Sequence, residues 1–205
     1  MRFKQDVESD ADAQLMLQAA AGDKRAFANL FDRYQASVVR FAYRFVGEQA
    51  KAEELAQEIF LKLYRSAGSY RASAKFKTFL FRVAANHCLN EVRRPEHRSS
   101  PQNPRQSPEA EERAEPPSPP GERPDEVVAG KELEAAVQRA LAAMSDRERA
   151  AFVMCRFEGM PYREIALAIS ATEPAVKSLI HRATLVMARE IRALDAGLVP
   201  TRSHG

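Results

Sequence analysis

The sequence contains no tryptophan, only two cysteines and no long uninterrupted run of apolar residues. Cys88 and Cys155 stand far apart and form no Cys-x-x-Cys pair, which argues against a disulfide framework or a cysteine-rich zinc site and suits a reducing compartment. The amino-terminal residues lack the apolar core of a signal peptide, and no apolar run approaches membrane-spanning length. We therefore expect a cytoplasmic protein that does not insert into a membrane.

Patterns typical of catalytic sites are also missing. The sequence has no glycine-rich phosphate loop and no assignable Ser/His/Asp arrangement. His87 and Cys88 are adjacent, but neighbours in a helix point in different directions, and no second pair stands at ligand spacing. We expect no enzyme activity, no metal and no cofactor. The net charge of +3 is too small to indicate a partner by itself.

Proline is abundant in one segment only. Nine of the twelve prolines fall between Pro95 and Pro124, and that stretch contains no Val, Ile, Leu, Met or aromatic residue. Such a composition cannot bury enough apolar surface to offset the entropy lost on ordering. The sequence therefore predicts a flexible linker over 95–126, between domains at 1–94 and 127–196, with a tail over 197–205.

The segments on either side of the linker have helical periodicity. Apolar residues recur at spacings of three and four over 27–45, 52–63 and 76–87, and a shorter helix is expected near 11–21. Gly47 and Gly68 are natural helix stops. No alternating apolar run predicts a strand. The expected fold class is all-α, with two small helical bundles joined by the Pro-rich linker.

The carboxy-terminal segment has the pattern of a helix-turn-helix. A short apolar stripe follows Tyr162, Thr172 is a good N-cap, and a longer helix follows it. In this motif the second helix lies in the major groove of DNA. Four residues of that helix face outward with side chains that hydrogen-bond bases or phosphates: Lys177, Ser178, His181 and Arg182. A helical hairpin with a solvated charged face fits the same spacing equally well.

Basic and aromatic residues alternate between Arg71 and Arg98. Seven bases and two acids give this segment a net charge of +5, and Phe76, Phe79 and Phe81 lie among them. Positive charge binds a phosphate backbone, and aromatic faces stack on unpaired bases. The pattern favours a protein that binds partly melted DNA. Part of the aromatic set must instead be core, because one helix cannot point three phenylalanines outward and still pack.

The preceding helix, 51–64, has an acidic outer face. Its polar residues there are Glu53, Glu54, Gln57 and Glu58. Such a face repels DNA and is suited to docking a basic helix, although an acidic face that is simply solvated remains the alternative.

Three segments together resemble the extracytoplasmic-function group of the bacterial sigma-70 family. FANLFDRYQASVVRFAYRFVGEQAKAEELAQEIFLKLYR is similar to regions 2.1 and 2.2, KFKTFLFRVAANHCLNEVRR to regions 2.3 and 2.4, and MSDRERAAFVMCRFEGMPYREIALAISATEPAVKSLIHRA to region 4. Three matches in this order are more specific than a helix-turn-helix alone. The resemblance implies a factor that binds core RNA polymerase, recognises the −35 and −10 promoter elements and promotes strand opening.

The resemblance also implies roles for particular residues. The residues that would dock on the polymerase β′ coiled coil are Glu53, Glu54, Gln57 and Glu58. The residues that would contact the −10 element and its single strand are Lys75, Phe76, Lys77, Thr78, Phe79, Arg82 and Asn86. Those at the −35 reading positions are Lys177, Ser178, His181 and Arg182. The β flap and an anti-sigma factor are further expected partners, and the loop 66–74 would form the pocket for an extruded base.

The chain departs from the family pattern at several positions. Phe79 stands where tryptophan is usual, Ser170 and Pro174 replace common glycines, and Leu179 replaces a frequent basic residue. Because of these departures, the −35 sequence that this chain prefers cannot be inferred from that of a relative. Two other hypotheses of function remain. The chain could be a helix-turn-helix regulator that acts without polymerase, or a helical adaptor that does not contact DNA. The +5 segment disfavours the adaptor.

Overall fold

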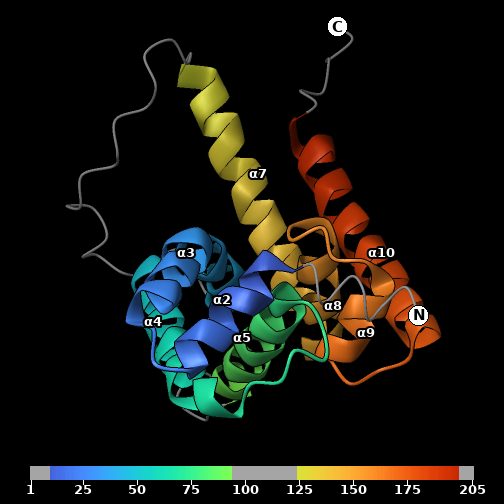
Figure 1. The fold of residues 1–205 in the computed structure, drawn as a ribbon. Helices are drawn as coiled ribbons and strands as arrows, with labels where there is room; N and C mark the ends of the chain where they lie inside the picture. Colours follow the sequence, from blue (N-terminus) through green and yellow to red (C-terminus); the bar gives the residue numbers. More distant parts are fainter. Residues whose placement is uncertain (1–9, 94–123, 199–205) are drawn as a thin grey trace, which may run out of the picture.

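The computed structural model describes residues 10–93 and 124–198, and helices account for nearly all of them (Figure 1). No strand occurs in these two ranges, so the expected all-α class is confirmed. None of the helices within them is long and apolar enough to cross a membrane.

Between residues 10 and 93 the chain forms four α-helices and one short 3₁₀ turn. They are α2 (Ala11–Ala20), α3 (Lys24–Val46), α4 (Gln49–Ser66), η1 (Ala67–Ser69) and α5 (Phe76–Arg93). Asp23 caps α3 by accepting hydrogen bonds from the backbone N–H groups of Arg25 and Ala26. Gly47 ends α3 in the left-handed conformation, with φ 72°, which is why the helix stops where the sequence predicts.

The core of this half is formed by the apolar stripes of α3, α4 and α5. Phe41 of α3, Leu55 and Leu63 of α4, and Leu80 and Phe81 of α5 are fully buried. Within each helix the buried residues recur at intervals of three to four residues, as at Leu55, Ile59 and Leu63 of α4, and they therefore lie on one face. The opposite faces carry most of the predicted binding residues; that of α4 remains at the surface, whereas the carboxy-terminal half covers part of that of α5.

The carboxy-terminal half contains α7 (Pro124–Ala143), α8 (Asp146–Arg156), α9 (Tyr162–Ala168) and α10 (Glu173–Leu198). A capping box opens α8: Ser145 Oγ accepts from the N–H of Glu148, and Glu148 Oε2 accepts from the N–H of Ser145. Helix α7 begins inside the segment predicted as linker, because proline is tolerated in the first turn of a helix. Helix α10 ends inside the predicted tail. The rest of the predicted linker and tail lies outside the described residues.

The two halves pack against each other. Helix α9 lies on α5, α8 contacts α3 and α5, and α7 contacts α3 (Figure 1). Buried apolar residues from both halves form one continuous cluster. Helices α7 and α10 pack together and extend away from this body. The sequence predicts two bundles but gives no indication of the contact between them.

Candidate nucleic-acid and protein interfaces

The start of α5 is fixed by an aspartate from the beginning of α2. Asp10 Oδ1 accepts from the N–H of Asp12, and Asp10 Oδ2 accepts from the N–H of Phe76 at 2.7 Å. Phe76 is 1% exposed and packs on Tyr34, with ring centroids 5.5 Å apart. Phe76, expected to contact DNA, is therefore a core residue in this structure. Asp10 was not among the predicted site residues, because a single acid ahead of a helix does not indicate a contact with a distant segment.

An exposed stripe runs along α5 beyond this start. Arg82 and Asn86 are exposed, and Phe79 is partly buried one turn earlier. The Phe79 ring lies 5.0 Å from the ring of Tyr70, and the Arg82 guanidinium lies 5.4 Å from the Phe79 centroid. The stripe thus combines an aromatic ring, a cation and an amide on one helix face. That combination suits an unpaired DNA strand.

Tyr70 supports the Phe79 ring from the loop after α4. Tyr70 is 3% exposed, and its hydroxyl has no hydrogen-bond partner among the described residues. Burial, together with the negative charge of Asp10, raises the pKa of Tyr70 to about 12. The hydroxyl is therefore neutral, and Tyr70 acts here as a packed ring beneath Phe79.

Three other predicted −10 residues contact the carboxy-terminal half. Lys75 Nζ lies 2.9 Å from Glu164 Oε1, and Thr78 Oγ1 donates a 3.1 Å hydrogen bond to Glu164 Oε2. Lys77 Nζ donates to the carbonyl oxygen of Glu158. Thr78 is only 2% exposed. The sequence pattern did not reveal Glu158 and Glu164, because isolated acids in a helical segment look like surface residues.

The acidic surface of α4 is accessible. Glu53, Glu54 and Gln57 are exposed, whereas Glu58 is half-buried and its Oε2 lies 2.6 Å from Nε2 of His87. Lys51 pairs with Glu54 at 2.8 Å, so part of the negative charge is compensated within the helix. The structure places all four predicted residues on one side of the helix, as expected.

Two apolar side chains continue this surface toward the end of α4. Leu61 is 53% exposed and Tyr64 is 46% exposed. They were not predicted, although Leu61 follows Gln57 by four residues and therefore shares its side of the helix.

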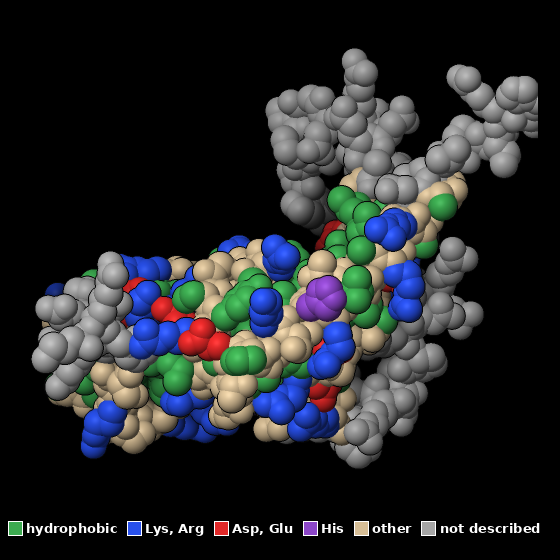
Figure 2. Space-filling model, turned by 90° about the vertical axis from the view of Figure 1, so that its right-hand side faces the viewer, with side chains coloured by type: hydrophobic (Ala, Val, Ile, Leu, Met, Phe, Trp, Pro, Cys, Tyr) green, Lys and Arg blue, Asp and Glu red, His purple; other side chains and the backbone are tan. Residues whose placement is uncertain are grey.

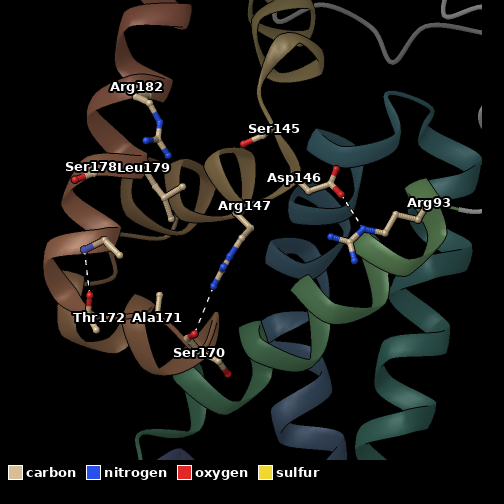
Figure 3. Close-up of a pocket in the computed structure, with 11 residues that line it drawn as sticks. Arg93, Ser145, Asp146, Arg147, Ser170, Ala171, Thr172, Ser178, Leu179 and Arg182 are labelled. Atoms are coloured by element: carbon tan, nitrogen blue, oxygen red, sulfur yellow. Dashed lines mark hydrogen bonds and ion pairs between the residues drawn. The ribbon is translucent and has the colours of Figure 1, made fainter.

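The turn of the helix-turn-helix is supported by an arginine from α8. Ser170 has φ 51°, a left-handed conformation that glycine adopts more easily. Arg147 donates to the carbonyl oxygen of Ile169 at 3.1 Å and to that of Ser170 at 3.4 Å, and Figure 3 shows Arg147 pointing toward Ser170. Thr172 Oγ1 accepts from the N–H of Ala175, which confirms it as the cap of α10.

The outward face of α10 carries the predicted −35 residues. Lys177, Ser178, His181 and Arg182 are all exposed. Leu179, in contrast, is 8% exposed and packs inward. Figure 2 views the side of the molecule on which α10 lies, and Lys and Arg side chains are more widespread there than Asp and Glu.

Arg182 is oriented by the glutamate of the capping box. Arg182 Nε lies 2.6 Å from Glu148 Oε1, beside an open groove of about 730 Å³ between α8 and α10 (Figure 3). Burial raises the pKa of Glu148, but hydrogen bonds from Ser145 and Arg182 outweigh it and leave the pKa below its usual value. Glu148 is therefore ionised at neutral pH and holds the guanidinium at the groove.

Comparison with known proteins relates both halves to one family. Residues 30–98 match the model of Sigma-70 region 2, and residues 134–185 match that of Sigma-70, region 4. The chain is 31% identical over 198 residues to the RNA polymerase sigma-H factor of Pseudomonas aeruginosa, covering 95% of this chain and 97% of that protein. It is also 31% identical over 189 residues to the ECF RNA polymerase sigma factor SigM of Mycobacterium tuberculosis, covering 92% and 88%. The chain belongs to the extracytoplasmic-function group of the sigma-70 family.

The fold of this sigma factor is also that of solved structures. CnrH in complex with the cytosolic domain of CnrY has a TM-score of 0.66 at 22% identity, covering 90% of this chain and 99% of CnrH. The region 2 match covers α3 from Leu30 onward together with α4 and α5, and the region 4 match runs from Glu134 in α7 to Leu185 in α10. The two candidate DNA surfaces therefore lie in different regions: the α5 stripe in region 2, and the α10 face in region 4.

Proposed function

We propose that this sigma factor binds core RNA polymerase through α4, reads the −35 element with α10 and opens the −10 element with α5. The proposal rests on two surfaces that occur together in this member of the family. One is the exposed acidic face of α4, and the other is the exposed aromatic and basic stripe of α5. A regulator that binds duplex DNA alone needs the helix-turn-helix but neither of these surfaces. The role is that of a non-catalytic transcription factor.

The acidic surface of α4 is proposed to dock on the β′ coiled coil. Glu53, Glu54 and Gln57 offer carboxylate and amide oxygens to a basic helical partner, and complementary charge steers such an encounter. The exposed Leu61 adds apolar area beside them. Glu58, held by His87, belongs to the same proposed surface but has part of its hydrogen-bonding capacity already engaged.

The stripe on α5 is proposed to hold the unpaired non-template strand. Extruding a base costs a few kcal/mol, which stacking and backbone contacts must offset. Phe79 offers the ring, Arg82 the cation and Asn86 the amide for this purpose. Lys75, Lys77 and Thr78 are proposed to join them, and the loop 66–74 to form the pocket for an extruded base. Phe76 supports this surface from the core.

Helix α10 is proposed to enter the major groove at the −35 element. Lys177, Ser178, His181 and Arg182 are exposed on the face that the helix-turn-helix geometry presents to DNA. The pairing of Arg182 with Glu148 restricts the arginine to one side of the helix. Region 4 is also proposed to contact the β flap.

An anti-sigma factor is proposed as a further partner, and the cytoplasm as the location in which the protein meets polymerase. The solved structure of the sigma factor RpoE with the anti-sigma factor NepR from Bartonella quintana shares this fold, with a TM-score of 0.59 at 19% identity. This similarity of fold supports an anti-sigma factor as the class of partner. The individual protein must be identified by experiment.

The proposed function is tested by a pull-down with core polymerase followed by run-off transcription on fragmented genomic DNA. We expect association with core and discrete transcripts that require the added chain. Specific binding to duplex operators as a dimer, without association with core, would instead support a helix-turn-helix regulator.

A further inference from the structure

The turn that leads into α10 contains a strained backbone position. Ser170 has φ 51°, and within residues 10–93 and 124–198 every other residue with a positive φ is a glycine. This left-handed conformation is disfavoured for a residue that carries a Cβ atom, whereas glycine adopts it without the steric penalty. The direction in which α10 leaves the turn therefore depends on a conformation that Ser170 does not favour by itself.

Hydrogen bonds from two sources hold the turn in this conformation. The N–H of Ala171 donates to the carbonyl oxygen of Ala166 at 2.9 Å. The carbonyl oxygens of Ile169 and Ser170 accept from one terminal nitrogen of Arg147, at 3.1 and 3.4 Å. Carbonyl oxygens at the end of a helix lack intrahelical donors and carry the negative end of the helix dipole, so a cation is favoured there. Arg147 meets this requirement at the end of α9.

The first turn of α8 contacts α10 at a second point. Glu148, the residue after Arg147, lies 2.6 Å from Arg182 through its Oε1 atom. The capping box with Ser145 fixes this turn of α8. Two adjacent residues of α8 therefore contact the turn before α10 and the face that α10 presents, on the two sides of the groove (Figure 3).

We propose that Arg147 is a positioning residue for −35 recognition, which holds Ser170 in the left-handed turn and thereby sets the angle at which α10 meets the duplex. The inference rests on the −35 function proposed for α10. Arg147 acts through the backbone of the turn and needs no contact with DNA. A glycine at position 170 would not need this support, so the effects of substitutions at positions 147 and 170 must depend on each other.

The expected size of the effect follows from the hydrogen bonds that Arg147 makes. Their loss should shift the ratio of the native turn to other turn conformations by about 3- to 10-fold. The apparent Kd for a duplex scales inversely with the fraction of chains in the binding-competent conformation. Arg147→Ala should therefore lose −35 recognition by a factor in this range, and adding Ser170→Gly should restore it.

The test measures promoter binding by the assembled holoenzyme. Two labelled fragments are compared, a promoter found by run-off transcription and the same fragment with a scrambled −35 element, and the readout is the ratio of their Kd values. Arg147→Ala should lower this ratio about 3- to 10-fold. Arg147→Ala with Ser170→Gly should return to within about 2-fold of the wild type, and Ser170→Gly alone should leave the ratio unchanged.

The matched control is Arg156→Ala, which removes the same charge from an exposed position in the last turn of α8. It should leave the ratio unchanged. A direct phosphate contact by Arg147 would instead weaken binding to both fragments equally and would not be rescued by Ser170→Gly. Either an equal loss on both fragments or a failure of the rescue would overturn the proposal.

Circular dichroism at the assay temperature separates positioning from stability. Arg147→Ala should be as helical as the wild type, and a loss of helical signal in proportion to the lost recognition would reduce Arg147 to a stabilising residue and overturn the proposal. A wild-type holoenzyme that does not distinguish the two fragments would refute the −35 function itself. A wild type that distinguishes them, with Arg147→Ala unchanged, would refute only the positioning by Arg147.

Discussion

Removal of the Phe79 ring should impair strand opening far more than polymerase binding. The ring packs on Tyr70 and lies under the Arg82 guanidinium, so it is held in place while part of it stays at the surface. Stacking of one base on an aromatic side chain contributes about 1–3 kcal/mol. Phe79→Ala should therefore reduce open-complex formation by roughly 5- to 150-fold.

A matched control separates this effect from lost stability. Phe27 is also half-buried and lies 5.0 Å from the ring of Tyr64, the same centroid distance that separates Phe79 from Tyr70. Losing either aromatic pair costs about 0.5–1.5 kcal/mol beyond the lost burial. Phe27→Ala and Phe79→Ala should thus have similar thermal midpoints, and only Phe79→Ala should lose strand opening.

The assay is run-off transcription from a duplex promoter beside the same promoter with a pre-melted bubble. The bubble should rescue Phe79→Ala, because the strands no longer have to be separated. It should not rescue Lys177→Ala, whose defect lies in reading the −35 duplex. The opposite pattern, with rescue of Lys177→Ala and none of Phe79→Ala, would refute the assignment of melting to α5 and duplex reading to α10.

Three further predictions concern charged groups. Reversing Glu53 and Glu54 to Lys should weaken core binding while the circular dichroism stays helical; unchanged affinity at low salt would contradict the docking assignment. Lys177→Ala and Arg182→Ala should each weaken −35 duplex binding by about 1–3 kcal/mol if they read bases, and an even loss across all sequences would indicate phosphate contacts instead. Burial raises the pKa of Glu158, so its ionised form is disfavoured in the folded chain and stability falls as pH rises through the raised pKa. Glu158→Gln should raise the thermal midpoint at neutral pH and flatten its pH dependence; a lower midpoint would show that the carboxylate is net stabilising.

The helices could be predicted from the sequence because local chemistry determines them. Gly47 ends a helix and Thr172 caps the next one at the predicted places. The spacing of apolar residues in α5 also indicated that Phe76 is buried. Its spacing to Leu80 placed it on the inner stripe, and the structure shows both side chains buried. The aromatic pattern alone did not distinguish Phe76 from Phe79.

The contact between the two regions could not be predicted, because it depends on tertiary placement. Glu164 lies 86 residues from Thr78 along the chain, and no local rule pairs them. Glu164 is also one acid in a short helix with an ordinary amphipathic pattern. Asp10 is a similar case: its cap on α2 is local and predictable, whereas its bond to Phe76 spans 66 residues.

The interface between the two regions buries charged groups at an energetic cost. Arg149 has two carbonyl acceptors, but its Nε has no partner among the described residues, and burial lowers its pKa. An unpaired buried donor and a desolvated cation both regain hydration when the regions separate, so they reduce the net stability of the interface. The proposed −35 residues on α10, such as Lys177, are exposed while the two regions are packed together. Duplex reading by α10 therefore requires no separation of the two regions, because the side chains proposed for it are already at the surface.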